Sequence, residues 1–410
     1  MPNKDKNIPK RRFKEFENAD AWELRKLGEL MNENSERTSD FANNPLYSLT
    51  IENGITPKTE RYERSSLVTK QEDLFKIVKP NEFVTNPMNL RFGALGYNSN
   101  SFRISVSGYY DVFSIDENRC SNYWYAFFKT DRALSILDNV STGSLIEKRR
   151  VKYSTLRQIS FRMPCELDEK IKIGNFFSTL DRHITLHQRK LDKLKSVKQA
   201  YLSEMFPAEG ERVPKRRFPG FTDAWELRKL GEYSTLITKG TTPRDKSGIG
   251  VVNFVKVENL VNGDIIPLQK IQLEEHEGYL KRSQLIENDI LFSIAGTLGR
   301  TAIVKKSILP ANTNQALSII RGYEFDRNFL VTILRGVVVR EFIKRNPTIG
   351  AQPNLSLEQV SNLCFLSPCS EEQSAIGTFF STLDRHITLH QRKLEKLKNL
   401  KKALLNELFV

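Results

Sequence analysis

Few residues in this chain have the types and spacing that catalysis requires. Asn44-Pro45-Leu46-Tyr47 is similar to the Asn-Pro-Pro-Tyr/Phe tetrapeptide of amino-methyltransferases, but the second proline is missing and no glycine-rich cofactor loop follows a strand. The sequence contains no P-loop, no GxSxG, no CxxC and no Pro-Asp dipeptide of the PD…ExK nucleases. We therefore predict no catalytic residue and favour binding over catalysis.

Four of the five histidines have the spacing of metal ligands on a helix. His183 and His187 stand at positions i and i+4, as do His386 and His390. The HExxH motif needs a glutamate after the first histidine, and this chain has isoleucine there in both copies. We predict a structural role for these histidines and no metal site.

Composition points to a soluble protein with an anionic partner. Of 410 residues, 27% are charged and 39% hydrophobic, and the net charge is +14. No apolar run approaches the ~18 residues of a membrane span, no secretory signal opens the chain, and the four cysteines suggest no disulfide framework. A cytoplasmic protein that binds nucleic acid is expected, although charge alone leaves a merely soluble basic protein possible.

An internal repeat decides the organisation of the chain. Residues 20–29 recur unchanged as 223–232, and residues 176–191 recur unchanged as 379–394, both at an offset of 203 positions. Between these blocks the sequences show no similarity by eye. Two different cassettes therefore occupy one repeated frame, unlike a solenoid, in which the contents repeat as well.

The repeat divides the chain into six segments. They are a linker at 1–30, a first cassette at 31–165, a helix at 166–206, a central linker at 207–232, a second cassette at 233–369 and a helix at 370–410. The predicted fold is α+β, with two globular α/β cassettes separated by two long helices and related by a pseudo-two-fold repeat.

The two long helices carry a heptad-like seam. Apolar positions recur at steps of three and four, with a polar histidine in each copy. The seam residues are Leu180, Ile184, His187, Leu191 and Leu194, and then Leu383, Ile387, His390, Leu394 and Leu397. We predict an antiparallel coiled coil of roughly 50 Å within the chain, although identical seams leave pairing with another chain open.

The start of the second helix fits a capping box. In Ser370-Glu371-Glu372-Gln373, the Ser370 oxygen is expected to accept a hydrogen bond from the Gln373 amide.

Both cassettes alternate short β-like runs with polar turns. Strands are predicted at 102–106, 251–257, 290–294 and 316–320. Arginine and lysine on turns suit phosphate and guanine, and asparagine and glutamine suit adenine. The candidate DNA contacts are Arg61, Tyr62, Arg64, Lys79, Asn89, Arg91 and Arg103 in the first cassette, and Lys239, Thr242, Arg244, Lys256, Arg300, Asn314 and Gln315 in the second. The alternative is that these are solvated surface residues.

Several long segments carry a resemblance to a known family. They are the two copies of FFSTLDRHITLHQRKL at 176–191 and 379–394, the stretch RRFPGFTDAWELRKLGE at 216–232, and KPNEFVTNPMNLRFGALG at 79–96. Over nearly its whole length, the chain resembles the specificity subunit of type I restriction-modification systems. It departs from the family pattern at 166–170, where the usual Glu-Gln pair is lost.

The resemblance implies a function and partners. Each cassette would be a target-recognition domain that reads one half of a bipartite, asymmetric double-stranded DNA site, with the helices fixing the gap. Two methyltransferase subunits would supply S-adenosylmethionine chemistry on adenine, and two restriction subunits would use ATP and Mg²⁺ for translocation and cleavage. The chain itself would bind no cofactor and catalyse no reaction. A free-standing bipartite DNA-binding regulator is the alternative. A fused restriction enzyme is disfavoured, because this chain lacks the motifs that such an enzyme needs.

Overall fold

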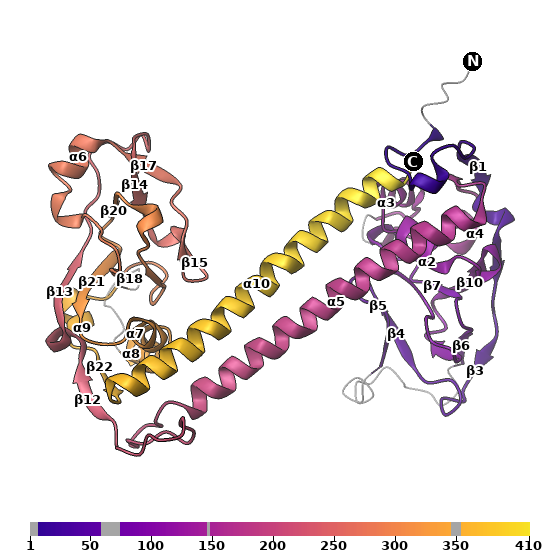
Figure 1. The fold of residues 1–410 in the computed structure, drawn as a ribbon. Coiled ribbons are helices and arrows are strands. Elements are labelled where there is room, and N and C mark those ends of the chain that lie inside the picture. The colour runs from indigo at the N-terminus through magenta and orange to yellow at the C-terminus, as the bar shows by residue number, and fades with distance from the viewer. Residues whose placement is uncertain (1–6, 59–73, 146–147, 346–353) are drawn as a thin grey trace. The chain divides into compact units, whose positions relative to one another are not determined.

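The computed structural model forms two compact units (Figure 1). It describes residues 7–58, 74–145, 148–345 and 354–410. Unit 1 contains residues 1–187 together with 393–410, and unit 2 contains residues 188–392. Each unit therefore holds one cassette, the start of one long helix and the end of the other.

The first cassette, in unit 1, is built on two small antiparallel sheets. One sheet has the order β2 (Met31–Glu33), β10 (Asp111–Ile115), β7 (Phe83–Thr85), β8 (Leu95–Tyr97), and the other β3 (Arg37–Thr38), β6 (Phe75–Val78), β9 (Ile104–Val106). A hairpin and three helices complete it: β4 (Tyr47–Thr50), β5 (Gly54–Pro57), α2 (Ser121–Phe127), α3 (Asp131–Val140) and α4 (Tyr153–Leu156).

The second cassette, in unit 2, also has a four-stranded and a three-stranded sheet. Their orders are β13 (Ser234–Lys239), β21 (Leu317–Tyr323), β18 (Ile290–Ser293), β19 (Thr301–Ile303), and β17 (Gln269–Ile271), β14 (Val252–Val255), β20 (Ala311–Thr313). The remaining elements are the hairpin β15 (Leu260–Val261) and β16 (Asp264–Ile265), and the helices α6 (Leu273–Glu277), α7 (Arg327–Leu334), α8 (Val337–Arg345) and α9 (Leu357–Ser361). The four predicted strands correspond to β9, β14, β18 and β21, with ends that differ by up to three residues.

The repeated segments before each cassette form a strand rather than a loose linker. Strand β1 (Glu23–Lys26) pairs with β11 (Ser160–Met163), and β12 (Glu226–Lys229) pairs with β22 (Cys364–Ser367), both antiparallel. Trp22 directly precedes β1 and is buried in the core of unit 1. Each ladder thus joins the two ends of a cassette, which makes the cassette a closed module.

The long helices lie where the sequence predicts them. Helix α5 spans Leu167–Glu204 and α10 spans Ser370–Leu408. The predicted capping box is wrong, because the Ser370 hydroxyl donates to Glu371 and the Gln373 amide donates to the Cys369 carbonyl at 3.0 Å. The Gln373 side chain donates instead to the Ser367 hydroxyl at 3.0 Å, so this side chain ties the helix start to β22.

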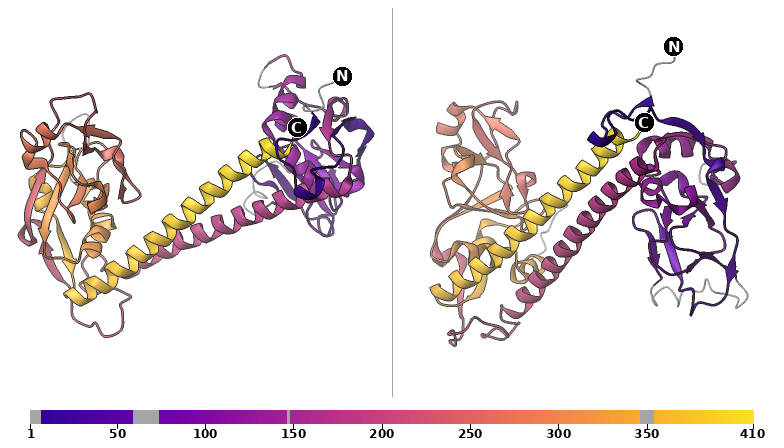
Figure 2. Two further views of the ribbon diagram at one scale, coloured as in Figure 1. Left: turned by 45° about the horizontal axis from the view of Figure 1, so that its top comes forward. Right: turned by 45° about the vertical axis from the view of Figure 1, so that its right-hand side comes forward.

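The two helices pair antiparallel within each unit. In unit 1 the last turns of α10 lie beside the first turns of α5, as both views of Figure 2 show, and Phe409 stacks on Phe177 with ring centroids 5.8 Å apart. In unit 2 the roles are exchanged, and Phe206 lies 5.9 Å from Phe380. These contacts confirm the predicted α+β fold with two long antiparallel helices paired within one chain.

The predicted seam residues face inward to different degrees. Leu180, His187, Leu191 and Leu394 are buried. The half-buried ones are Ile184, Leu194, Leu383, Ile387, His390 and Leu397. The seam also contains a repeated ion pair: Lys401 contacts Asp181 at 2.6 Å in unit 1, and Lys198 contacts Asp384 in unit 2. The two lysines are therefore paired with an aspartate of the opposite helix.

A buried carboxylate anchors each cassette ladder to its helix. In unit 1, Arg12 donates two hydrogen bonds to Glu169 at 2.7 and 2.6 Å, and the Trp22 indole lies 3.4 Å from the same carboxylate. The equivalent residues of unit 2 repeat the arrangement, with the glutamate and the tryptophan 203 positions later and the arginine 205 positions later. Arg217 donates to Glu372 at 2.8 and 2.6 Å, and the Trp225 indole lies 3.2 Å from that carboxylate. The carboxylate hydrogen bonds raise the pKa of each arginine.

Candidate nucleic-acid interface

A polar turn of the second cassette is fixed by backbone hydrogen bonds. The Arg244 and Asp245 amides donate to Glu275 of α6 at 2.7 and 3.2 Å. Thr241 donates to the Thr313 carbonyl at 2.9 Å. A side chain at Gly240 would place its Cβ 2.0 Å from that carbonyl oxygen, so the close approach requires glycine.

Exposed side chains from three segments meet around this turn. The Thr242 hydroxyl donates to the Gln315 side chain, and Arg282 lies 3.4 Å from the Thr241 hydroxyl. The Arg244 guanidinium lies 4.2 Å from the centroid of the Tyr279 ring. We call this set the turn cluster: Thr242, Arg244, Tyr279, Arg282 and Gln315, all exposed.

The turn cluster has the chemistry of a base-reading surface. A guanidinium stacked on an aromatic ring keeps its planar fork in place, which suits bidentate hydrogen bonds to guanine. A glutamine amide whose oxygen is oriented by a neighbouring hydroxyl suits adenine. Lys239, exposed at the end of β13, adds positive charge that suits phosphate.

Sequence reasoning named three members of the turn cluster and missed two. Thr242, Arg244 and Gln315 were candidates, and the structure brings them together. Tyr279 and Arg282 were missed because they are more than 30 positions from the other members and follow no recognisable turn. A surface assembled from three distant segments leaves no local pattern.

The other candidates of the second cassette have contacts within the protein. Arg300 is exposed but donates to the Val257 carbonyl at 3.3 Å. Lys256 is half-buried at the start of a short 3-10 helix. Asn314 accepts a hydrogen bond from the Ala316 amide at 3.2 Å, which closes a turn.

The candidates of the first cassette are more scattered. Arg61, Tyr62 and Arg64 lie outside the described residues. Lys79 pairs with Glu36, and Arg91 pairs with Asp138 at 2.9 Å and lies over the Phe92 ring. Asn89 and Arg103 are exposed. The described part of this cassette therefore shows no equivalent of the turn cluster.

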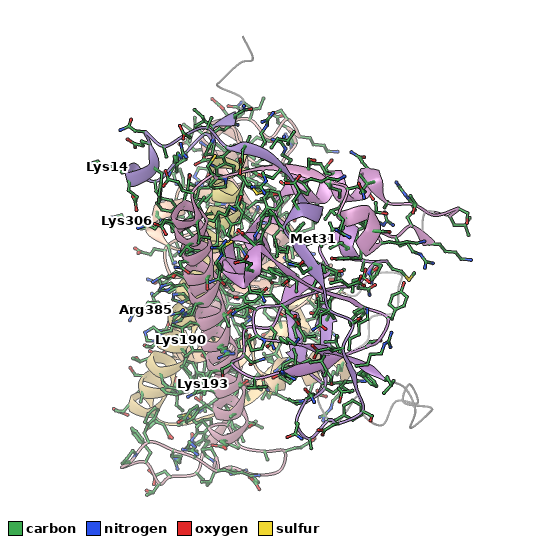
Figure 3. The ribbon with its side chains drawn as sticks, turned by 90° about the vertical axis from the view of Figure 1, so that its right-hand side faces the viewer. Lys14, Met31, Lys190, Lys193, Lys306 and Arg385 are labelled. Carbon is green, nitrogen blue, oxygen red and sulfur yellow. The ribbon has the colours of Figure 1, made fainter. Side chains whose placement is uncertain are left out.

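Basic side chains are exposed in both units. Figure 3 labels Lys190 and Lys193 on α5, Arg385 on α10, Lys306 in the second cassette and Lys14 in the N-terminal frame, and all five are exposed. These exposed basic residues are thus distributed over the frame and the second cassette.

The described residues contain neither a cluster of metal ligands nor a membrane-spanning helix. Within the described ranges, no group of three or more histidine, cysteine, aspartate or glutamate side chains could hold a metal ion. His183 is exposed while His187 is buried in the seam, so this pair does not present two ligands to one ion. Among the helices that are described, none is long and apolar enough to cross a membrane.

Comparison with known proteins identifies the repeated unit. A sequence model of the type I restriction modification DNA specificity domain matches residues 19–196 and again 222–399. The chain belongs to this family. The two matches begin 203 positions apart, the same offset as the repeat. Each specificity domain therefore includes the frame strand, the cassette and most of the following helix.

Two known specificity subunits are similar to this chain over most of its length. The type I restriction enzyme MjaVIII specificity subunit of Methanocaldococcus jannaschii is 21% identical over 301 residues, which cover 71% of this chain and 70% of that protein. The crystal structure of a type I restriction-modification S subunit from M. genitalium superposes with a TM-score of 0.66 at 13% identity, covering 98% of this chain and 99% of that one. The structural likeness shows that the fold is shared.

Proposed function

We propose that this specificity subunit reads a bipartite, asymmetric double-stranded DNA site, one half with each specificity domain. The observation that carries the proposal is the contrast between frame and cassette. The frame repeats its buried contacts in both units, while the turn cluster of the second cassette has no equivalent in the described part of the first. Two unlike surfaces on equivalent supports suit two unlike half-sites.

The partners of the proposed complex are two methyltransferase and two restriction subunits. The repeated frame offers the same exposed residues twice, including Leu24 and Leu227 on β1 and β12, which are 60% and 64% exposed. Exposed leucines at equivalent positions suit two copies of one partner. These partners would use S-adenosylmethionine, ATP and Mg²⁺, and this chain would be non-catalytic. Native mass spectrometry should show two methyltransferase subunits per chain, and a stable one-to-one end state would contradict this.

Methylation mapping tests the central proposal. Methylated adenines in the host genome should define one bipartite motif that disappears when this gene is deleted. Replacing residues 31–165 with the first cassette of a relative should then change one half of the motif and leave the other. If both halves changed, the two-reader proposal would be wrong. Tight operator binding by the isolated chain, without any methylation motif, would favour a free-standing regulator.

The long helices are proposed to set the unread gap between the two half-sites. Helices of 38 and 39 residues extend about 57 Å at 1.5 Å per residue. Seven residues inserted after Arg189 and after the equivalent Arg392 keep the seam and add about 10 Å. The gap should lengthen by about three base pairs while both half-sites stay the same. An active complex with an unaltered gap would show that the helices are not the ruler.

A further inference from the structure

The two cassettes, unlike in sequence, present a similar helix to the frame. Helix α2 in unit 1 and helix α7 in unit 2 each have asparagine as second residue and an aromatic as third. These pairs are Asn122-Tyr123 and Asn328-Phe329. The two aromatic side chains are fully buried, so each helix is fixed at its N-terminal end.

Each buried aromatic side chain packs on the equivalent phenylalanine of the frame in its own unit. Tyr123 lies 5.4 Å from Phe409, and Phe329 lies 6.1 Å from Phe206, measured between ring centroids. Phe206 and Phe409 are equivalent residues of the repeat, 203 positions apart. The frame therefore provides one aromatic surface in each unit, and each cassette fills it with a ring.

The backbone of each long helix approaches the same point of the cassette helix. A side chain at Gly174 of α5 would place its Cβ 2.5 Å from the Tyr123 amide nitrogen. A side chain at Gly377 of α10 would place its Cβ 2.7 Å from the Phe329 amide nitrogen. The two glycines are equivalent in the repeat, so both contacts depend on the absence of a side chain at one frame position.

A cation follows each aromatic at a distance of six residues. These cations are Lys129 and Arg335. Arg335 contacts Asp384 of α10 at 3.6 Å. Lys129 lies beside Lys401 and Leu405 of α10, where burial and the charge of Lys401 lower its pKa and the charge of the equivalent Asp181 opposes them. Both cassettes therefore place a cation near the aspartate of the repeated seam ion pair.

The same cations hold a part of the cassette sheets. Lys129 donates to the Ile51 carbonyl, in the turn of the β4–β5 hairpin, at 3.1 Å. Arg335 donates to the Thr301 carbonyl of β19 at 2.8 Å. The turn of the β15–β16 hairpin also lies against Arg335, because a Cβ at Gly263 would be 2.3 Å from its guanidinium. Each cation thus links the end of the cassette helix to a hairpin turn.

We infer that the buried aromatic and the cation six residues later form a docking element, shared by unlike cassettes, that seats each of them in a repeated socket of the frame. The socket consists of the glycine, the aspartate and the phenylalanine that recur at offset 203. Lys129 and Arg335 are then positioning residues, which hold the DNA-reading surface of each cassette at a fixed place on the frame. The inference rests on the proposed function only for what each cassette reads once it is seated.

Hydrogen exchange of the full chain at pH 7 tests the docking element in each unit separately. In Arg335→Met, amide exchange in α7 and at residues 262–263 should rise about tenfold, while α2 and residues 50–54 stay unchanged. Lys129→Met should give the mirror image. Arg335→Lys should restore much of the protection, because the cation is kept. Arg327→Met is the matched control, since Arg327 is an exposed residue of the same helix that contacts Asn288 rather than the frame.

The outcomes separate docking from general stability and from function. Unchanged exchange in Arg335→Met would overturn the inference, and so would an equal rise in both units, because docking requires a confined effect. Methylation mapping of the same variants keeps the two proposals distinguishable. If the wild-type complex methylates no bipartite motif, the proposed function fails while the exchange result still decides the docking element. If the motif exists and exchange is unaffected, only the docking element fails.

Discussion

Unit 1 and unit 2 bury the same frame contacts around different cassettes. Glu169 and Glu372 each accept two hydrogen bonds from the equivalent arginine and lie next to the equivalent tryptophan. Phe409 and Phe206 pack on the aromatic residues of their own unit. Identical residues in the two repeats have produced nearly identical packing, even though the enclosed sequences share no visible similarity.

The two cassettes differ in their polar surfaces, although the frames that support them make equivalent contacts. In the first cassette, the candidate cations Lys79 and Arg91 form ion pairs with carboxylates of the same cassette. In the second cassette, Arg244 stacks on an exposed tyrosine and remains accessible. The repeat therefore supplies the same support twice, whereas the two cassettes carry different polar surfaces on it. Four predictions test how far the equivalence of the two supports extends.

The largest effect is expected from breaking the buried ion pair of each frame. Arg12→Met and Arg217→Met each leave a carboxylate that is at most 1% exposed without its partner. Each should lower the free energy of unfolding by about 3 to 5 kcal/mol, in its own unit. Urea unfolding followed by hydrogen exchange measures each unit.

Arg216→Met is the control for the ion-pair prediction. Arg216 is the neighbouring arginine, is 54% exposed and pairs with Glu204, so its replacement should leave the free energy of unfolding nearly unchanged. Costs for Arg12→Met and Arg217→Met that differed by more than about 2 kcal/mol would contradict equivalent frames.

A slightly smaller effect, and an unequal one, is expected at the repeated phenylalanine. Phe409 is buried and contacts four aromatic rings, whereas Phe206 is half-buried and contacts three. Phe409→Ala should cost about 3 to 4 kcal/mol and Phe206→Ala about 2 to 3 kcal/mol. Thermal and urea unfolding give both values, and a larger cost for Phe206→Ala would show that ring contacts do not set the difference.

The glycines of the socket should give a moderate and matched effect. Gly174→Ala and Gly377→Ala each force a methyl group against a backbone amide. Each should lower the free energy of unfolding by about 1 to 3 kcal/mol, a net value that already includes the gain of up to about 1 kcal/mol in helix propensity. Thr378→Ala, at an exposed neighbouring position of α10, should change stability by under about 0.5 kcal/mol. Urea unfolding that showed either glycine variant to be more stable than wild type would refute the close approach at that position.

The smallest effect is a pH dependence confined to unit 1. Burial and the charge of Lys401 lower the pKa of Lys129 to about 8, against the opposing effect of Asp181. The unfolded chain, with a pKa of about 10.4, binds more protons between these values, so the contribution of Lys129 to stability rises with pH from about 8 to about 10.4.

Comparison of variants isolates this contribution. The stability difference between wild type and Lys129→Met should shift in favour of wild type as the pH rises from 7 to 10. The difference for Arg335→Met should stay constant, because a guanidinium keeps its proton over this range. Parallel pH curves for wild type and Lys129→Met would contradict the lowered pKa.

More of the structure of the frame than of the cassettes could be predicted from the sequence. The long helices and their seam follow from uninterrupted three-four spacing, a local signal. The capping box failed because the helix begins at Ser370 itself, so that the Gln373 amide bonds to the Cys369 carbonyl and the Gln373 side chain to Ser367, the last residue of β22. The linker strand β1 was missed because its partner β11 begins more than 130 residues later.

The docking element was invisible for a related reason. Tyr123 and Phe329 are 206 positions apart rather than 203, so superposing the two halves at the offset of the frame misaligns them. Two matching residues in a short helix also fall below what the eye detects. The turn cluster combines residues from three separate segments, and only tertiary structure brings Tyr279 and Arg282 to Arg244 and Thr241.

The composition of the two units has a consequence for the order of events during synthesis. Unit 2 is one continuous segment, 188–392, whereas the core of unit 1 includes Leu404, Leu408 and Phe409 as well as Trp22. A ribosome adding roughly 5 to 20 residues per second needs roughly 10 to 45 s to pass from residue 187 to residue 404. During that interval the rings of Trp22, Tyr123 and Phe177 lack one of their native packing partners, because Phe409 has not yet been synthesised. The cassette that is synthesised first is therefore the last whose core is completed. A prematurely terminated chain leaves these aromatic rings exposed, which makes it a substrate for chaperones and proteases.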